Sequence, residues 1–234
     1  MRLLITDCTW PAMTMAVRLR DMKFRLSPVD DGEGLLLGVE QGAHDAVLID
    51  ADLPDMTALA AVRGARGRCA RLPIVVLAPG LSRGDRAALY RAGADLVLSP
   101  RPGTAPDAGE LAARLRAMVL RVHGFSGPEI RLGALTLDVA RRTARVGGVH
   151  LALAPTEYEL LEILALAHGR TLPREELMLR LYAWDEDAPD ARVLDVHLAR
   201  LRRKIVAAGG PRGAVATVWG RGLRLVAAAP PLVA

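Results

Sequence analysis

The sequence predicts two domains of different classes, an α/β domain over residues 1–124 and an α+β domain over residues 130–234. Residues 1–124 alternate five times between a short apolar run and a helix-like segment, whereas the second half places helices between two groups of short strands. The run Gly124-Phe125-Ser126-Gly127-Pro128 separates the two patterns and predicts a linker over residues 125–129. A chain of 234 residues is long enough for two domains that each bury a core.

The first domain is expected to contain five parallel strands covered by helices on both faces. The expected strands are Arg2–Thr6, Phe24–Pro28, Ala46–Asp50, Ile74–Leu77 and Leu96–Leu98. The expected helices are Trp10–Met22, Gly34–Gln41, Thr57–Arg66, Gly84–Ala92 and Asp107–Val122. Continuous apolar strands such as Ile74-Val75-Val76-Leu77 are typical of a parallel sheet that is buried on both sides.

The second domain is expected to begin with a small antiparallel sheet. Its expected strands are Ile130–Leu135, Thr136–Val139, Ala144–Val146 and His150–Leu153, with turns at Arg141-Arg142 and Gly147-Gly148. The expected helices are Pro155–His168, Pro173–Tyr182 and Ala191–Val206. A hairpin from Val215 to Val226, turning at Gly220-Arg221-Gly222, completes what we interpret as a winged helix-turn-helix.

The composition excludes several classes of protein and favours a nucleic-acid partner. Hydrophobic residues make up 51% of the chain and charged residues 24%, which excludes a collagen, a disordered tail and a disulfide-rich scaffold. The 31 basic residues outnumber the 26 acidic ones, and only Lys23 and Lys204 among them are lysines. The resulting pI near 9.8 favours binding to nucleic acid, although GC-rich coding can also produce an arginine-rich chain.

The sequence offers no motif for an enzyme or a cofactor. Gly32-Glu33-Gly34 and Gly220-Arg221-Gly222 each begin a GxGxxG motif and lack its third glycine, and there is no P-loop, HExxH or GxSxG. Cys8 and Cys69 have no metal-binding spacing and are expected to be reduced thiols of a cytoplasmic protein. Because no apolar run approaches the roughly 18–20 residues that span a bilayer, no contact with a membrane is expected.

The last helix, Ala191–Val206, has one apolar face and one basic face. Leu194, Leu198, Leu201 and Ile205 recur at helical spacing and predict the packed face. The opposite face carries the residues expected to contact DNA: Arg192, Val196, His197, Arg200, Arg203 and Lys204. Arg200 is central and is expected to bind guanine, Val196 is expected near a thymine methyl group, and the others suit phosphates.

The terminal hairpin strengthens this interpretation. Arg221 lies between two glycines at the expected tip, from which it could reach a narrow minor groove. From Arg192 to Arg224 the sequence has eight basic residues and a single acid, Asp195. The helix alone could be a solvated cationic surface, but the helix and the hairpin together predict binding to double-stranded DNA.

Three segments of the second domain resemble the output domain of OmpR/PhoB-type response regulators, most of all the CtrA-like cell-cycle regulators: Pro155–Leu161, Leu194–Lys204 and Thr217–Gly222. The first domain is similar to their receiver domain, a flavodoxin-like α/β fold, so the resemblance covers the whole chain. It implies a transcription regulator with the recognition helix at Arg192–Lys204 and a Trp184–Pro189 loop that faces RNA polymerase. At Ala154 the family usually has a helix-capping threonine.

The resemblance places the phosphoacceptor of the receiver at Asp50, with Asp7 and Asp52 as the residual acidic pocket. The remaining switch positions have lost the acid, the hydroxyl and the lysine that the family uses, and carry Thr6, Ala78, Ser99 and Pro100. Lys23, which follows the first helix, is the only lysine in the first 124 residues. Because phosphoryl transfer depends on these charges, we expect that Asp50 is not used and that neither Mg²⁺ nor another metal or cofactor binds at Asp7 and Asp50.

The resemblance also implies a homodimer through the receiver, with Glu110, Arg114 and Arg121 of the fifth helix on the dimer face. Leu96 replaces an acid there, which favours constitutive association. Two alternatives stay open: a conventional regulator switched by phosphorylation of Asp50, and a receiver that binds a protein or small ligand that controls DNA binding. The expected location is the cytoplasm, in association with the nucleoid.

Overall fold

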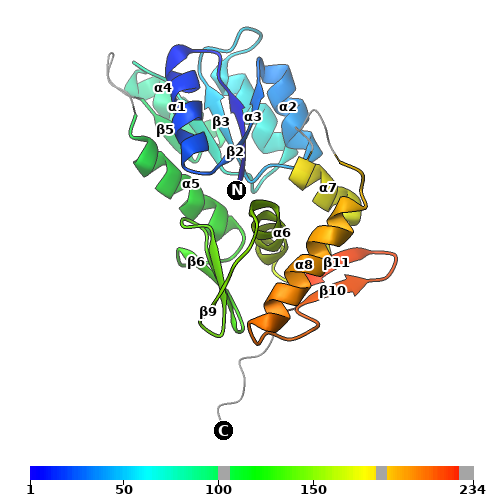
Figure 1. Cartoon of the computed structure of the whole chain (residues 1–234). Coiled ribbons are helices and arrows are strands. Elements are labelled where there is room, and N and C mark those ends of the chain that lie inside the picture. Colours follow the sequence, from blue (N-terminus) through cyan, green and yellow to red (C-terminus); the bar gives the residue numbers. More distant parts are fainter. Residues whose placement is uncertain (100–105, 183–188, 227–234) are drawn as a thin grey trace. The chain divides into compact units, whose positions relative to one another are not determined.

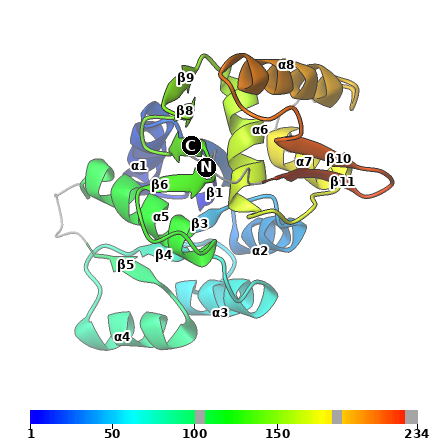
Figure 2. The ribbon, with the colours of Figure 1, turned by 90° about the horizontal axis from the view of Figure 1, so that it is seen from below.

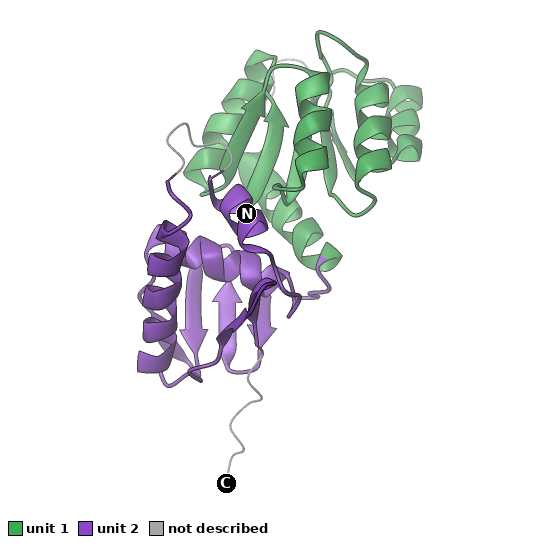
Figure 3. Cartoon of the chain, turned by 90° about the vertical axis from the view of Figure 1, so that its right-hand side faces the viewer, with its two compact units in different colours: residues 1–122 green, residues 123–234 purple. Residues whose placement is uncertain are grey.

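The computed structural model describes residues 1–99, 106–182 and 189–226. The chain divides into two compact units, residues 1–122 and 123–234, which Figure 3 shows in different colours. Pro100 and, apart from Pro189, the Trp184–Pro189 segment lie outside the described residues. Among the described residues, every helix is too short or too polar to cross a membrane.

The first unit is built on a five-stranded parallel sheet in the order β2-β1-β3-β4-β5 (Figure 1). Its strands are β1 (Arg2–Thr6), β2 (Arg25–Val29), β3 (Ala46–Asp50), β4 (Ile74–Leu77) and β5 (Leu96–Leu98). The predicted α/β class is confirmed, and only β2 is displaced, by one residue. Because the strands are parallel, their carboxyl ends meet at one edge of the sheet, where Asp50 lies.

Helices cover both faces of this sheet. They are α1 (Trp10–Asp21), α2 (Gly32–Gln41), α3 (Ala58–Arg68), α4 (Arg83–Ala92) and α5 (Ala108–Val122). Helices α2, α3 and α4 pack on one face, and α1 and α5 pair on the other (Figure 2). Asp31, Thr57 and Ser82 accept hydrogen bonds from the first turns of α2, α3 and α4, which sets where these helices begin.

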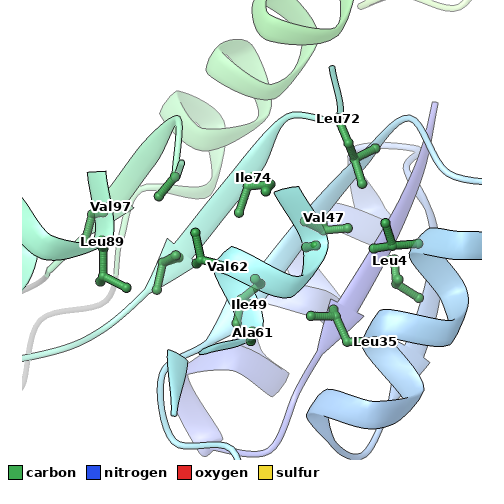
Figure 4. Close-up of a cluster of buried hydrophobic side chains, with 14 of the residues drawn as sticks. Leu4, Leu35, Val47, Ile49, Ala61, Val62, Leu72, Ile74, Leu89 and Val97 are labelled. Carbon is green, nitrogen blue, oxygen red and sulfur yellow. The ribbon is translucent and has the colours of Figure 1, made fainter. Parts of the chain in front are cut away.

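The core beneath α2, α3 and α4 is a continuous layer of aliphatic side chains (Figure 4). From the sheet come Leu4, Val47, Ile49 and Ile74, and among the helical residues that meet them are Leu35, Val62 and Leu89. Each buried side chain of this size stabilises the fold by about 1.5–3 kcal/mol. This layer therefore fixes the strand ends that carry the pocket around Asp50.

The second unit begins with a four-stranded antiparallel sheet in the order β6-β7-β8-β9. Its strands are β6 (Glu129–Leu132), β7 (Leu135–Asp138), β8 (Thr143–Val146) and β9 (Val149–Leu151). The predicted strand Ile130–Leu135 is wrong at its end, because the chain turns at Gly133, at φ +60°, and Leu135 begins the next strand. Within the predicted linker, Phe125 is buried and stacks on His168, and Glu129 already belongs to β6.

Three helices and a hairpin follow the sheet. The helices are α6 (Pro155–Leu166), α7 (Arg174–Tyr182) and α8 (Val193–Ala207), and the hairpin consists of β10 (Val215–Val218) and β11 (Gly222–Leu225). Helix α6 packs against α7, α8 and β11. Leu172, which precedes α7, forms an isolated antiparallel β-bridge with Leu223 of the hairpin. The predicted winged helix-turn-helix is confirmed.

Candidate nucleic-acid interface and the pocket around Asp50

Helix α8 presents two faces of opposite character. The predicted apolar residues Leu194, Leu198, Leu201 and Ile205 are all buried. Four side chains on the other face are exposed and form what we call the exposed stripe: Arg192, Val196, Arg200 and Arg203. Residues spaced three or four apart share one side of a helix, so these four lie in a single row.

His197 and Lys204 lie between the two faces of α8 and are only half-exposed. The Nζ atom of Lys204 donates to Oε2 of Glu157 at 2.6 Å, and the same oxygen accepts the backbone N–H of Ala154 at 2.7 Å. Burial opposes ionisation of Glu157, but its hydrogen bonds and the charge of Lys204 hold its pKa below the ordinary value. Lys204 thus joins α8 to the first turn of α6.

Arg202 connects α8 to the hairpin. Its Nε donates to the carbonyl oxygen of Val215, and a terminal guanidinium nitrogen donates to Oγ1 of Thr217, both at 2.8 Å. The rigid, planar guanidinium suits such a two-point clamp. Arg174 of α7 pairs with Asp195 of α8 at 2.7 Å, which balances the acid beside the exposed stripe.

The hairpin ends in a tight turn that exposes Trp219 and Arg221. The N–H of Arg221 donates to the carbonyl oxygen of Val218 at 2.9 Å. Gly220 has φ +68°, as the third residue of a type II turn requires. The sequence predicted that Arg221 lies at the tip but did not single out Trp219, whose side chain is 91% exposed. Its position directly before Gly220, at the expected hairpin turn, could have identified Trp219 as an exposed residue.

Gly222 fixes how the hairpin joins the rest of its unit. It has φ +127°, and a Cβ at this position would lie 1.9 Å from the carbonyl oxygen of Leu172. This close approach lets Leu172 and Leu223 exchange backbone hydrogen bonds at 2.8 and 2.9 Å. The hairpin is therefore held both through Leu172 and through Arg202.

In the first unit, Asp50 is buried at the carboxyl end of β3, and both of its carboxylate oxygens accept backbone hydrogen bonds. Oδ2 accepts the N–H of Thr9 at 2.8 Å, and Oδ1 accepts the N–H of Asp52 at 3.3 Å. Burial raises the pKa of Asp50 above its ordinary value, and these hydrogen bonds act in the opposite direction. The backbone of the chain thus holds the carboxylate in place.

The positions predicted to be degenerate have roles within the fold. Thr6 is fully buried, and its hydroxyl oxygen accepts the backbone N–H of Asp50 at 2.7 Å. Ala78 is buried at the end of β4, and the hydroxyl oxygen of Ser99 accepts the N–H of Leu81 at 3.2 Å. The hydroxyl oxygens of Thr6 and Ser99 therefore both accept hydrogen bonds from backbone N–H groups.

The acidic residues predicted around Asp50 differ in exposure. Asp7 is half-buried and Asp52 is exposed. Burial and the charges of Asp50 and Asp7 raise the pKa of the Cys8 thiol, so both carboxylates lie near it. The sequence analysis also missed a structural role of Asp55, which accepts the N–H groups of Gly32 and Glu33 at 2.8 and 2.9 Å and thereby caps α2.

Comparison with known proteins identifies the family. Residues 148–225 match the family described as "Transcriptional regulatory protein, C terminal". The chain is 31% identical over 224 residues to the cell cycle transcriptional regulator CtrA of Caulobacter vibrioides, which covers 94% of this chain and 93% of the relative. It is 32% identical over 224 residues, with the same coverage, to the cell cycle response regulator CtrA of Brucella anthropi. The chain belongs to the OmpR/PhoB family of response regulators.

Among solved structures, the response regulator DrrB of Thermotoga maritima, an OmpR/PhoB homologue, is 22% identical with a TM-score of 0.44, covering 96% of this chain and 98% of that chain. The family assignment rests on the CtrA relatives. In the terms of this family, the first unit is the receiver domain and the second unit is the DNA-binding output domain.

The surface predicted to form the receiver dimer lies on α5. Glu110 and Arg114 form an ion pair within the helix, and Arg121 is exposed further along it. The expectation that Leu96 makes this surface more apolar is wrong, because Leu96 is buried. At the edge of the sheet, the hydroxyl oxygen of Tyr90 accepts the N–H of Val97 at 3.2 Å.

The surroundings of Asp50 offer few ligands for the Mg²⁺ ion that the family resemblance implies. This hard cation takes about six oxygen ligands, several of which are usually water. Asp7 and Asp50 are two candidate carboxylates, but both oxygens of Asp50 accept backbone hydrogen bonds and Thr6 stands where the resemblance implies a further acid. Among residues 1–99, 106–182 and 189–226, no three His, Cys, Asp or Glu side chains are grouped so that they could hold a metal ion. The donor set is therefore smaller than the one that the family resemblance implies.

Proposed function

We propose that this response regulator binds double-stranded DNA with α8 in the major groove and the hairpin tip in the adjacent minor groove. The observation that carries the proposal is the exposed stripe of α8 beside a hairpin that Arg202 ties to the same helix. An α-helix fits the major groove, and a narrow minor groove attracts an inserted arginine. Both elements belong to one unit and can act on one duplex.

Each residue of the interface is proposed to have one role. Arg200 binds O6 and N7 of a guanine, and Val196, one turn earlier, contacts a thymine methyl group. Arg221 enters the minor groove. Three further residues contact phosphates, which provide affinity and register rather than sequence information: Arg192, His197 and Arg203. Lys204 is left out of this set because it is bound to Glu157.

We further propose that DNA binding does not require phosphorylation of Asp50. The pocket has Thr6 and Ser99 engaged with backbone N–H groups and Ala78 at the hydroxyl position, so a phosphoryl group would gain few of the partners that it needs. The rival function, a conventional phosphorylation switch, is favoured by one observation: Asp50 itself is retained at the end of β3. Acetyl phosphate with Mg²⁺ should tighten DNA binding only if the rival is correct.

The partners follow from the same proposal. The regulator acts as a homodimer through α4, β5 and α5, with Glu110, Arg114 and Arg121 on the dimer face, and binds direct repeats about 10–11 bp apart. It contacts RNA polymerase through the Trp184–Pro189 segment. It has no enzymatic activity and acts at the nucleoid, in the cytoplasm.

Arg200→Ala tests the assignment of the recognition residue. Loss of a bidentate arginine–guanine contact should weaken specific binding by about 1–3 kcal/mol and relax the preference for one base pair. The measurement is fluorescence anisotropy on a duplex that the wild-type protein selects from a randomised pool. Arg145→Ala, an exposed arginine on β8, is the matched control and should leave binding unchanged. Equal binding by Arg200→Ala and the wild type would overturn the assignment.

A further inference from the structure

Trp219 is the most exposed large apolar side chain among the described residues. Single apolar residues on a surface are common and do not by themselves indicate a partner. Trp219, however, is held at the end of a hairpin, as the second residue of the turn that the Arg221 N–H closes on Val218. Figures 1 and 2 both show this tip projecting away from the helices of the second unit. The indole is therefore among the first groups to meet any surface that the tip approaches.

The hairpin is held firmly relative to α8. Leu172 pairs with Leu223 through two backbone hydrogen bonds, and Arg202 reaches from α8 to Val215 and Thr217. A side chain presented on such a support loses little freedom when it binds. The position of the indole is thus set by the same contacts that set the position of Arg221.

The charge around Trp219 indicates which kind of partner it meets. Residues 207–226 contain Arg212, Arg221 and Arg224 and no acidic residue. All three arginines are exposed. A cationic surface of this kind favours a polyanion over an apolar protein groove. In DNA, apolar deoxyribose rings lie between the phosphates along the walls of the minor groove, so a flat aromatic ring and a cation can both be accommodated there.

We propose that Trp219 contacts DNA beside Arg221, with its indole packed against the deoxyribose wall of the minor groove that Arg221 enters. This inference rests on the proposed function of the hairpin and adds a contact of a different kind. Arg221 neutralises phosphate charge and displaces counterions, whereas the indole is neutral and displaces none. The two contacts therefore have different salt dependences.

The test compares three variants of the full chain on the selected duplex, with anisotropy measured over a series of salt concentrations. Trp219→Ala should raise Kd about tenfold, near the lower end of the cost of losing a base–aromatic stack in single-stranded complexes, and leave the slope of log Kd against log salt unchanged. Arg221→Ala should reduce that slope by about one. Trp10→Ala, which removes an exposed tryptophan from the receiver domain, is the matched control and should bind as the wild type does.

A second measurement distinguishes loss of the indole contact from a loss of affinity that arises because Trp219→Ala destabilises the hairpin. The chain has three tryptophans, so Trp10→Phe combined with Trp184→Phe leaves Trp219 as the only indole. Adding the duplex should reduce quenching of its fluorescence by acrylamide. Trp219→Phe, which keeps an aromatic ring, should retain most of the affinity.

Each outcome decides between the alternatives. Unchanged Kd in Trp219→Ala, or unchanged accessibility of Trp219 to acrylamide, would overturn the inference. A fall in salt slope in Trp219→Ala would also overturn it, because the loss would then come from displacement of Arg221. If Arg200→Ala weakens binding while Trp219→Ala does not, only this inference fails. If Arg200→Ala also has no effect, the proposed placement of α8 in the major groove fails as well.

Discussion

Replacing Lys204 by glutamine should destabilise the output domain and leave its contacts with DNA intact. Glu157 has a side chain only 2% exposed, and Lys204, 33% exposed, lies 2.6 Å from its Oε2 atom. Breaking a fully buried ion pair costs about 3–5 kcal/mol. Because Lys204 is partly exposed, solvent screens its attraction to Glu157, so a loss of about 2 kcal/mol is expected here. For a domain of about 100 residues this corresponds to a decrease in Tm of about 10 °C.

The pH dependence provides a second signature of the Lys204 contact. The folded pKa of Glu157 lies below its ordinary value of 4.5, so the pair contributes stability above pH 4.5 that is lost as the pH falls through the folded pKa. Without Lys204, burial of the carboxylate is no longer offset by the cation. The deficit of Lys204→Gln should therefore be greatest near neutral pH and should shrink in acid, where Glu157 is protonated.

The assay is thermal unfolding followed by circular dichroism, together with the salt slope of DNA binding. Arg131→Gln is the matched control, because Arg131 and Glu129 form a pair at 2.8 Å whose arginine is exposed, and such surface pairs contribute at most about 1 kcal/mol. A variant Lys204→Gln with unchanged Tm and a salt slope reduced by about one would refute the reasoning and return Lys204 to the phosphate contacts.

Three further substitutions test individual contacts. Gly222→Ala should cost more than about 2 kcal/mol of unfolding free energy in urea titrations, because the added Cβ would meet the Leu172 carbonyl. Gly220→Ala, also at positive φ but in open space, should cost about 1–2 kcal/mol. Equal costs would contradict the close contact between the hairpin and Leu172. Thr6→Val should cost about 1–3 kcal/mol by leaving the buried N–H of Asp50 without its acceptor, and an unchanged urea midpoint would exclude that role. Arg202→Gln should weaken binding to the selected duplex several-fold with little change of base preference, and a changed preference would mean that Arg202 itself contacts bases.

The sequence was most informative about the parallel sheet. Four strands have their predicted bounds because a strand buried on both faces must be apolar throughout, and β4 from Ile74 to Leu77 is such a run. The β6–β7 boundary was missed because apolar residues continue on both sides of Gly133. The glycine at φ +60° marks the turn, and Leu132 and Leu135 pair across it.

The interface could be predicted only in part. Helical spacing identified both faces of α8, and it also places His197 and Lys204 between them, which their partial burial reflects. The contact of Lys204 with Glu157 joins residues that are 47 positions apart and depends on how α8 crosses α6. The clamp by Arg202 likewise depends on the packing of the hairpin against α8. Periodicity within one segment cannot supply contacts of this kind.

Whether DNA binding is independent of phosphorylation at Asp50 is the question that decides how this regulator is controlled. The measurement is the Kd for the selected duplex, determined for the wild type and for Asp50→Asn, each with and without acetyl phosphate and Mg²⁺. If binding is independent of phosphorylation, as proposed, all four values should agree within about twofold, a difference of roughly 0.4 kcal/mol. Tightening of about tenfold by acetyl phosphate in the wild type, and not in Asp50→Asn, would contradict this independence and show that the receiver is a working switch.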